Sequence, residues 1–274
     1  MFKKSYFSQN GEDGIIEKIL SIIGDGNKKF CEVGASNGIN LSNTRRLTEK
    51  GWEGLLIECD KTKFKDLERN YKRYPKIKCI QKYIDNKSNN INDICKKYGF
   101  SNLDFLSIDI DGLDFEILES LKIRPRMICI EVNAGHYYDS NDKIPLSVAK
   151  NNVGQPLKLF SAKAKKMGYG LLCYTGNAFY TQKDIVKKYN LKILSDRIAY
   201  TNFIDSLSDK ECEWLYLVNL GLVYPYYFYR NRSLSGNDLN IPLKRRIRLI
   251  AEQTVSVNFV NVLKAHFLRL LIKQ

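Results

Sequence analysis

Two acids and two glycines near the N-terminus have the types and spacing of a nucleotide-cofactor site. The segment EVGASNG (32–38) ends one apolar run, and Glu58 ends the next. After a buried strand, glycines let the chain turn tightly and bring backbone N–H groups near a ligand, and an acid about 20 residues further on can hold ribose hydroxyls. Only Gly34 and Gly38 are present, so the turn departs from the G-x-G-x-x-G of dinucleotide folds. Because Glu32 would repel phosphates but suit an ammonium group, the pattern favours S-adenosylmethionine over NAD.

A second set of oxygen-bearing side chains follows two later apolar runs. Asp109 and Asp111 are two residues apart, so in a continuing strand both point to one side, where like charges need a cation or a shared proton. Glu131 and Asn133 have the same spacing after the next run. These side chains could hold a hard cation such as Mg²⁺, with Asp109, Glu131 and Asn133 as its ligands. Alternatively, Asp111 begins a turn and Glu131 only supports a neighbour.

An enzyme that used S-adenosylmethionine on a hydroxyl would need in-line approach to the sulfonium carbon and a base for the proton, with much of the rate coming from positioning. His136, three residues after Asn133, is the obvious base because histidine titrates near neutral pH. Asp111, beside Asp109, is the rival base. A loop histidine without a catalytic role is the third alternative.

The elements that must position these residues alternate between short apolar strands and amphipathic helices. Strands are predicted at 29–33, 54–58, 77–84, 103–109, 126–132, 169–175 and 178–181. Helices are predicted at 14–23, from about Ser42, and at 61–74, 91–98, 113–121, 157–167 and 208–221. Such alternation predicts a parallel sheet that binds ligands beyond the carboxyl ends of its strands. The dipeptide Gly176-Asn177 predicts a hairpin, so the last strand is expected to be antiparallel.

The fold class expected is therefore α/β: a doubly wound, Rossmann-like, seven-stranded and mostly parallel sheet with an antiparallel last strand. Residues 1–205 are expected to form this domain, and residues 206–274 a helical, basic C-terminal extension. No stretch of the 274 residues reaches the roughly 18 uncharged apolar residues of a membrane span. The start of the chain lacks the apolar core of a signal peptide, so cytoplasmic residence is the expectation.

The net charge of +14 is the one abnormal global property, and nearly half of it lies in the last thirty-odd residues. Residues 244–274 contain seven Lys or Arg and one acid, Glu252. A basic amphipathic helix there could lie on anionic lipid, pair two copies of the chain, or pack on its own domain. Nucleic acid is an unlikely partner, because the chain lacks an (N/D)PP(Y/F) motif and an evident stripe in which basic and aromatic residues alternate.

With these residues in place, the chain resembles the S-adenosylmethionine-dependent methyltransferases of the FkbM-like kind. The resemblance runs from about Tyr6 to Asp184 and rests on several segments together. They are SQNGEDGII (8–16), FCEVGASNG (30–38), SNT (42–44), GWEGLLIE (51–58), LSIDIDGLDFEIL (106–118), RMICIEVNA (126–134), VGQPL (153–157) and GYGLLCYTGNAFY (168–180). The C-terminal seventy residues lie outside it.

The resemblance implies roles for the first group of residues. Gly34, Ala35 and Gly38 would pass beneath the methionine part of S-adenosylmethionine, and Glu32 would take its ammonium group directly or through water. Glu58 would accept both ribose hydroxyls.

Further cofactor contacts are implied elsewhere in the chain. Asp85 would meet the adenine amine, unless it is simply a turn aspartate, and Asp109 would also border the cofactor. Gln9 and Asp13 would fold over the pocket together with Asn43, unless the acids of that segment only cap the first helix.

The family implies methyl transfer, commonly to a hydroxyl of a sugar or another secondary metabolite. The expected partner is thus a small-molecule or glycan acceptor, perhaps in bacterial surface polysaccharide synthesis, and the positive charge suits an anionic one. Two alternatives stay open: a nucleic-acid methyltransferase, and a non-catalytic scaffold that works through its basic tail.

Overall fold

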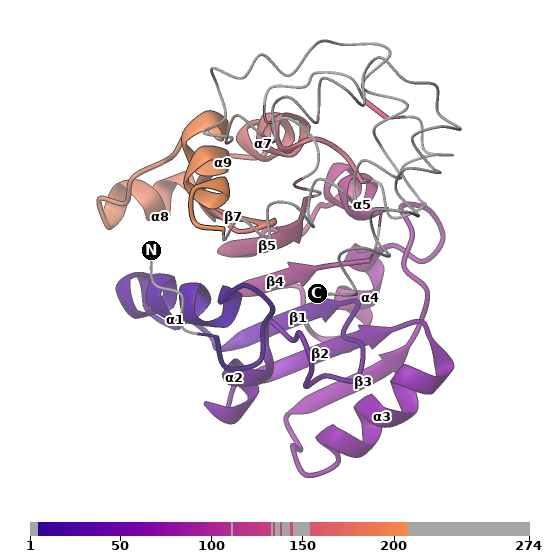
Figure 1. Cartoon of the computed structure of the whole chain (residues 1–274). Coiled ribbons are helices and arrows are strands. Elements are labelled where there is room, and N and C mark those ends of the chain that lie inside the picture. Colours follow the sequence, from indigo (N-terminus) through magenta and orange to yellow (C-terminus); the bar gives the residue numbers. More distant parts are fainter. Residues whose placement is uncertain are drawn as a thin grey trace, which may run out of the picture. The chain divides into compact units, whose positions relative to one another are not determined.

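The strands form one seven-stranded sheet in the computed structural model, which describes residues 5–110, 112–132, 134, 138, 143–144 and 154–207. The strands are β1 (Lys29–Val33), β2 (Glu53–Glu58), β3 (Ile77–Gln81), β4 (Phe105–Ile108), β5 (Met127–Glu131), β6 (Tyr169–Tyr174) and β7 (Asn177–Gln182). Their order is β3-β2-β1-β4-β5-β7-β6, and Figure 1 shows β3 to β7 in that order from bottom to top.

The direction of the strands confirms the predicted fold class. β1 pairs in parallel with β2 on one side and with β4 on the other, and β5 continues the parallel run beside β4. β7 is antiparallel to both β5 and β6, between which it lies. The strand order therefore reverses at β1 and β4, where open α/β sheets bind their ligands.

Helices connect and cover the strands, as Figure 1 shows. They are α1 (Glu12–Ile23), α2 (Arg45–Glu49), α3 (Lys61–Tyr71), α4 (Ile91–Tyr98), α5 (Asp114–Ser120), α7 (Leu157–Lys166), α8 (Lys183–Lys188) and α9 (Asp196–Ile204). α3 packs on β2 and β3, and α5 packs against α7, which lies on β6. α8 and α9 are additions to the predicted elements, whereas the predicted helix at 208–221 lies outside the described residues.

α2 begins later than predicted. The pattern predicts a helix from about Ser42, but the helix starts at Arg45. Ser42 Oγ accepts the N–H groups of Thr44 and Arg45, so it caps the turn ahead of α2. The hydroxyls of Ser42 and Thr44 also donate to Glu32, which holds residues 42–44 against the acid of β1.

The core explains why β1 and β2 read as continuous apolar runs. Both strands are central and buried beyond their first residue, whereas the edge strand β3 is partly exposed along its length. Phe30 and Phe105 face one cluster with Trp52 and Met127. Gly54 is required beside them, because any Cβ there would overlap the ring of Phe30.

The chain divides into two units, Met1–Tyr200 and Thr201–Gln274. The predicted boundary at 205/206 stays a prediction. The basic tail at 244–274, with its proposed lipid or dimer contacts, lies outside the described residues and also stays a prediction. Among the residues that are described, no helix is long and apolar enough to cross a membrane.

Candidate cofactor and acceptor site

Acidic residues gather where neighbouring strands of the sheet end. Glu58 is the last residue of β2, and Glu131 is the last residue of β5. Glu32 is the penultimate residue of β1, and Asp109 directly follows β4. Because β2, β1, β4 and β5 are adjacent and parallel, the structure places these four residues along one edge of the sheet.

The glycine turn after β1 is held close to β4. Gly34 has φ +81° and donates its N–H to the carbonyl of Ile57, 3.0 Å away. A Cβ at Gly34 would overlap the backbone carbonyl of Asp109, and one at Gly38, with φ +74°, would overlap the ring of Tyr71. Both positions need glycine for backbone conformation and for space.

Glu58 joins the glycine turn to the start of α3. It is 6% exposed, and its Oε2 accepts the N–H of Ser36 at 2.7 Å while its Oε1 accepts the N–H of Asp60 at 2.8 Å. A carboxylate offers about four acceptor positions, so each oxygen keeps capacity for one more donor. These free acceptor positions suit the O–H donors of two neighbouring ribose hydroxyls, and the ribose role stays a prediction.

Glu32 has a different environment. It is 4% exposed and accepts from Ser42 Oγ at 3.0 Å, from the Asn43 N–H at 2.9 Å and from Thr44 Oγ1 at 2.6 Å. Burial raises the pKa of Glu32, and these three donors oppose the rise. Glu32 therefore fixes the conformation of residues 42–44. Its contact with the ammonium group of the cofactor stays a prediction.

Asn43 lies inside the fold, between the strands and the segment after β1. It is buried, and its side-chain amide donates to Ser107 Oγ of β4 at 3.0 Å and lies 3.9 Å from Cys129 Sγ of β5. The residue thus ties the 42–44 segment to the strands at the switch point.

The N-terminal segment is organised by two buried acids at the start of α1. Asp13 accepts the N–H groups of Tyr6 and Phe7 at 3.0 and 2.7 Å and the hydroxyl of Ser8 at 2.9 Å. Glu12, which the sequence analysis did not single out, accepts the Thr175 hydroxyl at 2.8 Å and so fastens α1 to the turn between β6 and β7. These contacts hold the segment before α1 in place, and the side chains of both acids are bound outside the helix cap. The cofactor role of Asp13 stays a prediction.

The other two cofactor candidates lie in exposed positions or turns. Gln9 is exposed. Asp85 accepts the N–H groups of Lys87 and Asn89 at 2.8 and 2.9 Å, and these bonds lower its pKa. Asp85 therefore closes its own turn, as aspartates often do, and its contact with adenine stays a prediction.

Asp114 is a site residue that the sequence analysis missed. It is 3% exposed and accepts the N–H groups of Ile110 and Gly112, both at 3.0 Å. Burial, together with the negative charge of Asp109, raises the pKa of Asp114 to about 7. Near neutral pH, the Asp114 carboxyl is therefore divided between its protonated and ionised forms, close to Asp109. The sequence offered one signal for this residue, because Asp114 is the third acid of SIDIDGLD.

Three predicted residues lie outside the described part of the chain: Asp111, Asn133 and His136. Within the described residues, no group of three His, Cys, Asp or Glu side chains is placed to hold a metal ion. The predicted Mg²⁺ site finds no support there.

The sheet order, the antiparallel β7, the glycine turn after β1 and the acid ending β2 together define a class I methyltransferase fold. Residues 80–161 match the family model of the methyltransferase FkbM domain, which confirms the resemblance stated above. This matched segment and the sheet order are features of S-adenosylmethionine-dependent methyltransferases.

The solved structures that the chain resembles are distant. A TehB-like S-adenosylmethionine-dependent methyltransferase from Corynebacterium glutamicum is 13% identical over 65% of this chain and 89% of its own, with a TM-score of 0.41. A putative caffeoyl-CoA O-methyltransferase from Staphylococcus aureus is 11% identical over 64% and 84%, with a TM-score of 0.42. The METTL16 methyltransferase domain is 18% identical over 43% of this chain, which spans about half (51%) of it, with a TM-score of 0.35. No curated protein matches the sequence.

Proposed function

We propose that this protein transfers the methyl group of S-adenosylmethionine to a hydroxyl of a sugar or glycoconjugate precursor. A small, anionic acceptor fits the net charge of +14. The resemblance to FkbM-like methyltransferases supports this class of acceptor. Bacterial surface polysaccharide synthesis is the setting that we propose for it.

One observation supports the site assignment most directly: a single carboxylate joins the two halves of the cofactor pattern. Glu58 is 22 residues beyond Ser36, yet it accepts the N–H of that residue within the glycine turn. The acid for the ribose and the turn for the methionine part thereby form one hydrogen-bonded unit. The cofactor fits this site, because both oxygens of Glu58 can still accept hydrogen bonds and no phosphate must be held beside the acids.

The residues at the ends of β4 and β5 would serve the acceptor. S-adenosylmethionine supplies an electrophilic methyl group on a sulfonium. Asp109 can accept the proton of the attacking hydroxyl, and Asp114 can hold a proton close behind it near neutral pH. Asp111 and His136 remain proposed bases as well.

A transfer assay with methyl-labelled S-adenosylmethionine tests the proposal. The acceptors would be nucleotide-activated sugars, a lipid-linked glycan fraction, and RNA and DNA, each with wild type and with Glu58→Gln. We expect label as an alkali-stable methyl ether on a sugar, and much less with the variant. Label in nucleic acid alone, or cofactor binding without transfer to any fraction, would contradict the proposed acceptor class.

A further inference from the structure

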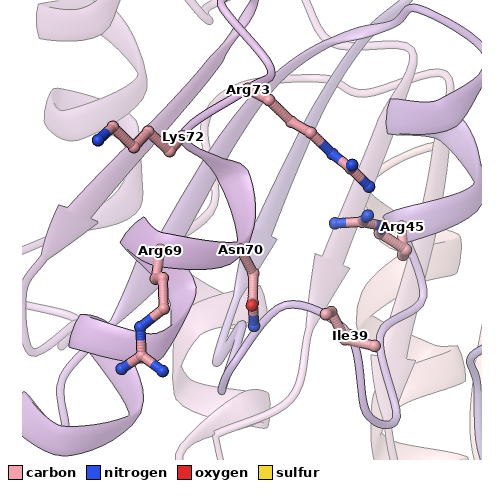
Figure 2. Close-up of a pocket in the computed structure, with 6 residues that line it drawn as sticks. All are labelled: Ile39, Arg45, Arg69, Asn70, Lys72 and Arg73. Atoms are coloured by element: carbon pink, nitrogen blue, oxygen red, sulfur yellow. The ribbon is translucent and has the colours of Figure 1, made fainter.

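A basic pocket of about 510 Å³ lies between the segment that follows the glycine turn and the end of α3. Figure 2 shows its lining, which is four cations, one amide and one aliphatic side chain. They are Arg45, Arg69, Lys72, Arg73, Asn70 and Ile39. No acid lines this pocket, in contrast to the strand ends.

Arg45 is the buried residue of this pocket. Its side chain is 6% exposed, and its guanidinium lies over the rings of Tyr71 and Tyr74, 5.0 and 4.8 Å from their centroids. Nη2 donates to the Tyr74 hydroxyl at 2.9 Å, and Nε lies 3.6 Å from Glu49. Nη1 is buried and has no hydrogen-bond partner among the described residues. Leaving a charged donor buried and unused is costly, so this nitrogen points to a missing acceptor.

The other cations differ in whether an acid already neutralises them. Arg69 pairs with Asp66 at 2.6 Å, and in Figure 2 its guanidinium points away from Arg45. Within the part of the chain that the structure describes, Lys72 and Arg73 form no ion pair. Figure 2 shows the guanidinium groups of Arg45 and Arg73 pointing toward one another. Two like charges that converge on one space repel each other unless an anion lies between them.

We propose that this pocket binds a phosphate or diphosphate group between Arg45 and Arg73. Guanidinium groups match phosphate oxygens with paired N–H donors, and the aromatic walls keep the Arg45 fork fixed in one orientation. The ligand class is thus a phosphorylated molecule, either free in solution or as the headgroup of a lipid. This site goes beyond the proposed methyl transfer and does not depend on it.

The pocket shares its wall with the cofactor turn, and this decides which variants are informative. The Tyr71 hydroxyl donates to the carbonyl of Gly38 at 2.6 Å, and the N–H of Arg45 donates to Ser42 Oγ at 3.0 Å. Because the Arg45 guanidinium packs on the rings of Tyr71 and Tyr74, replacing Arg45 would disturb this wall as well as the pocket. Arg73 is exposed on the turn after α3, where its guanidinium lies 5.5 Å from the centroid of the Tyr74 ring. Arg73→Gln therefore removes one charge and one surface ring contact and leaves the buried Arg45 in place.

Isothermal titration with inorganic pyrophosphate tests the site in the full-length protein. The charge-matched control is Lys65→Gln, because Lys65 is exposed on the same helix but does not line the pocket. We expect saturable one-to-one binding by wild type, an affinity reduced about tenfold or more in Arg73→Gln, and no change in the control. Absence of saturable binding, or equal weakening in both variants, would overturn the proposal.

A second arm distinguishes the two sources of phosphate. Co-sedimentation would use phosphatidylcholine vesicles with and without phosphatidic acid, for wild type and for Arg73→Gln. Binding that needs phosphatidic acid, is lost in the variant and is competed by pyrophosphate would assign a lipid headgroup. Pyrophosphate binding without vesicle binding would assign a soluble phosphorylated ligand. Failure of both probes would overturn the site, while leaving the methyltransferase assignment intact.

Discussion

The segment from Gly34 to Arg45 runs from an acidic site at the strand ends to a basic pocket beside α3, and the two sites treat charge differently. At the strand ends, Glu32 and Glu58 are buried and each accepts two or three hydrogen bonds from the protein. In the basic pocket, Arg45 is equally buried but keeps an unused donor. Acids whose hydrogen bonds come from the protein itself hold the shape of a site before any ligand arrives. A cation left unsatisfied indicates that a ligand completes the site.

The strongest test of the acidic site is a substitution at Gly34, where the glycine turn lies close to the backbone carbonyl of Asp109. Gly34→Ala should lower the free energy of unfolding by about 3 kcal/mol or more, because Cβ meets the Asp109 carbonyl in addition to the strained φ. Gly51→Ala is the matched control: its φ is +78° and nothing lies within 4 Å of the added Cβ. We expect the control to lose about 1 kcal/mol in urea denaturation. Equal losses in both variants would mean that the close approach to β4 is unimportant.

The hydrogen bonds of Glu32 should make it the more structural of the two acids. Glu32→Gln should cost about 2 kcal/mol of unfolding free energy, because an amide cannot accept from all three donors of the 42–44 segment. Glu53→Gln is the control, since Glu53 pairs with Lys29 at the surface and should cost less than about 0.5 kcal/mol. A Glu32 variant as stable as its control would remove the contrast between satisfied acids and unsatisfied cations.

A smaller effect should appear in the pH dependence of stability, and it tests whether a buried, hydrogen-bonded acid beside a second acid keeps a proton near neutral pH. Asp114 has a pKa raised to about 7 in the folded protein, so between its unfolded value near 4 and pH 7 the folded state holds the extra proton. Stability should therefore fall as pH rises through this window, by about 1 kcal/mol from pH 6 to pH 7. Asp114→Asn should lack this contribution. Denaturation curves at both pH values that change in parallel for wild type and variant would contradict it.

The strands were predictable because central parallel strands are buried on both faces and therefore read as short apolar runs. The exact onset of α2 was not, because the capping residue Ser42 marks a turn whose regular helix begins only at Arg45, while its hydroxyl also binds Glu32 ten residues earlier. For the same reason, the chain order could place Glu58 and Asp109 at strand ends but not reveal which backbone groups they would bind.

Two features of the sites depend on tertiary packing alone. Asp114 reads as the first acid of a helix, and its raised pKa arises only from burial beside Asp109. Arg45 reads as one of two arginines on a short helical face, yet Tyr71 and Tyr74 of the following βαβ unit enclose it. The spacing of residues in the sequence cannot show which charged side chain on a helix becomes buried by residues from another part of the chain.

The affinity for S-adenosylmethionine, measured by isothermal titration for wild type and Glu58→Gln, tests the central claim most directly. A cofactor analogue lacking both ribose hydroxyls separates the ribose contact from any general damage to the fold. The account predicts that wild type binds the cofactor about 100-fold more tightly than the variant does, and that the analogue binds equally weakly to both proteins. Equal cofactor affinity in the two proteins, or no binding by wild type, would contradict the account.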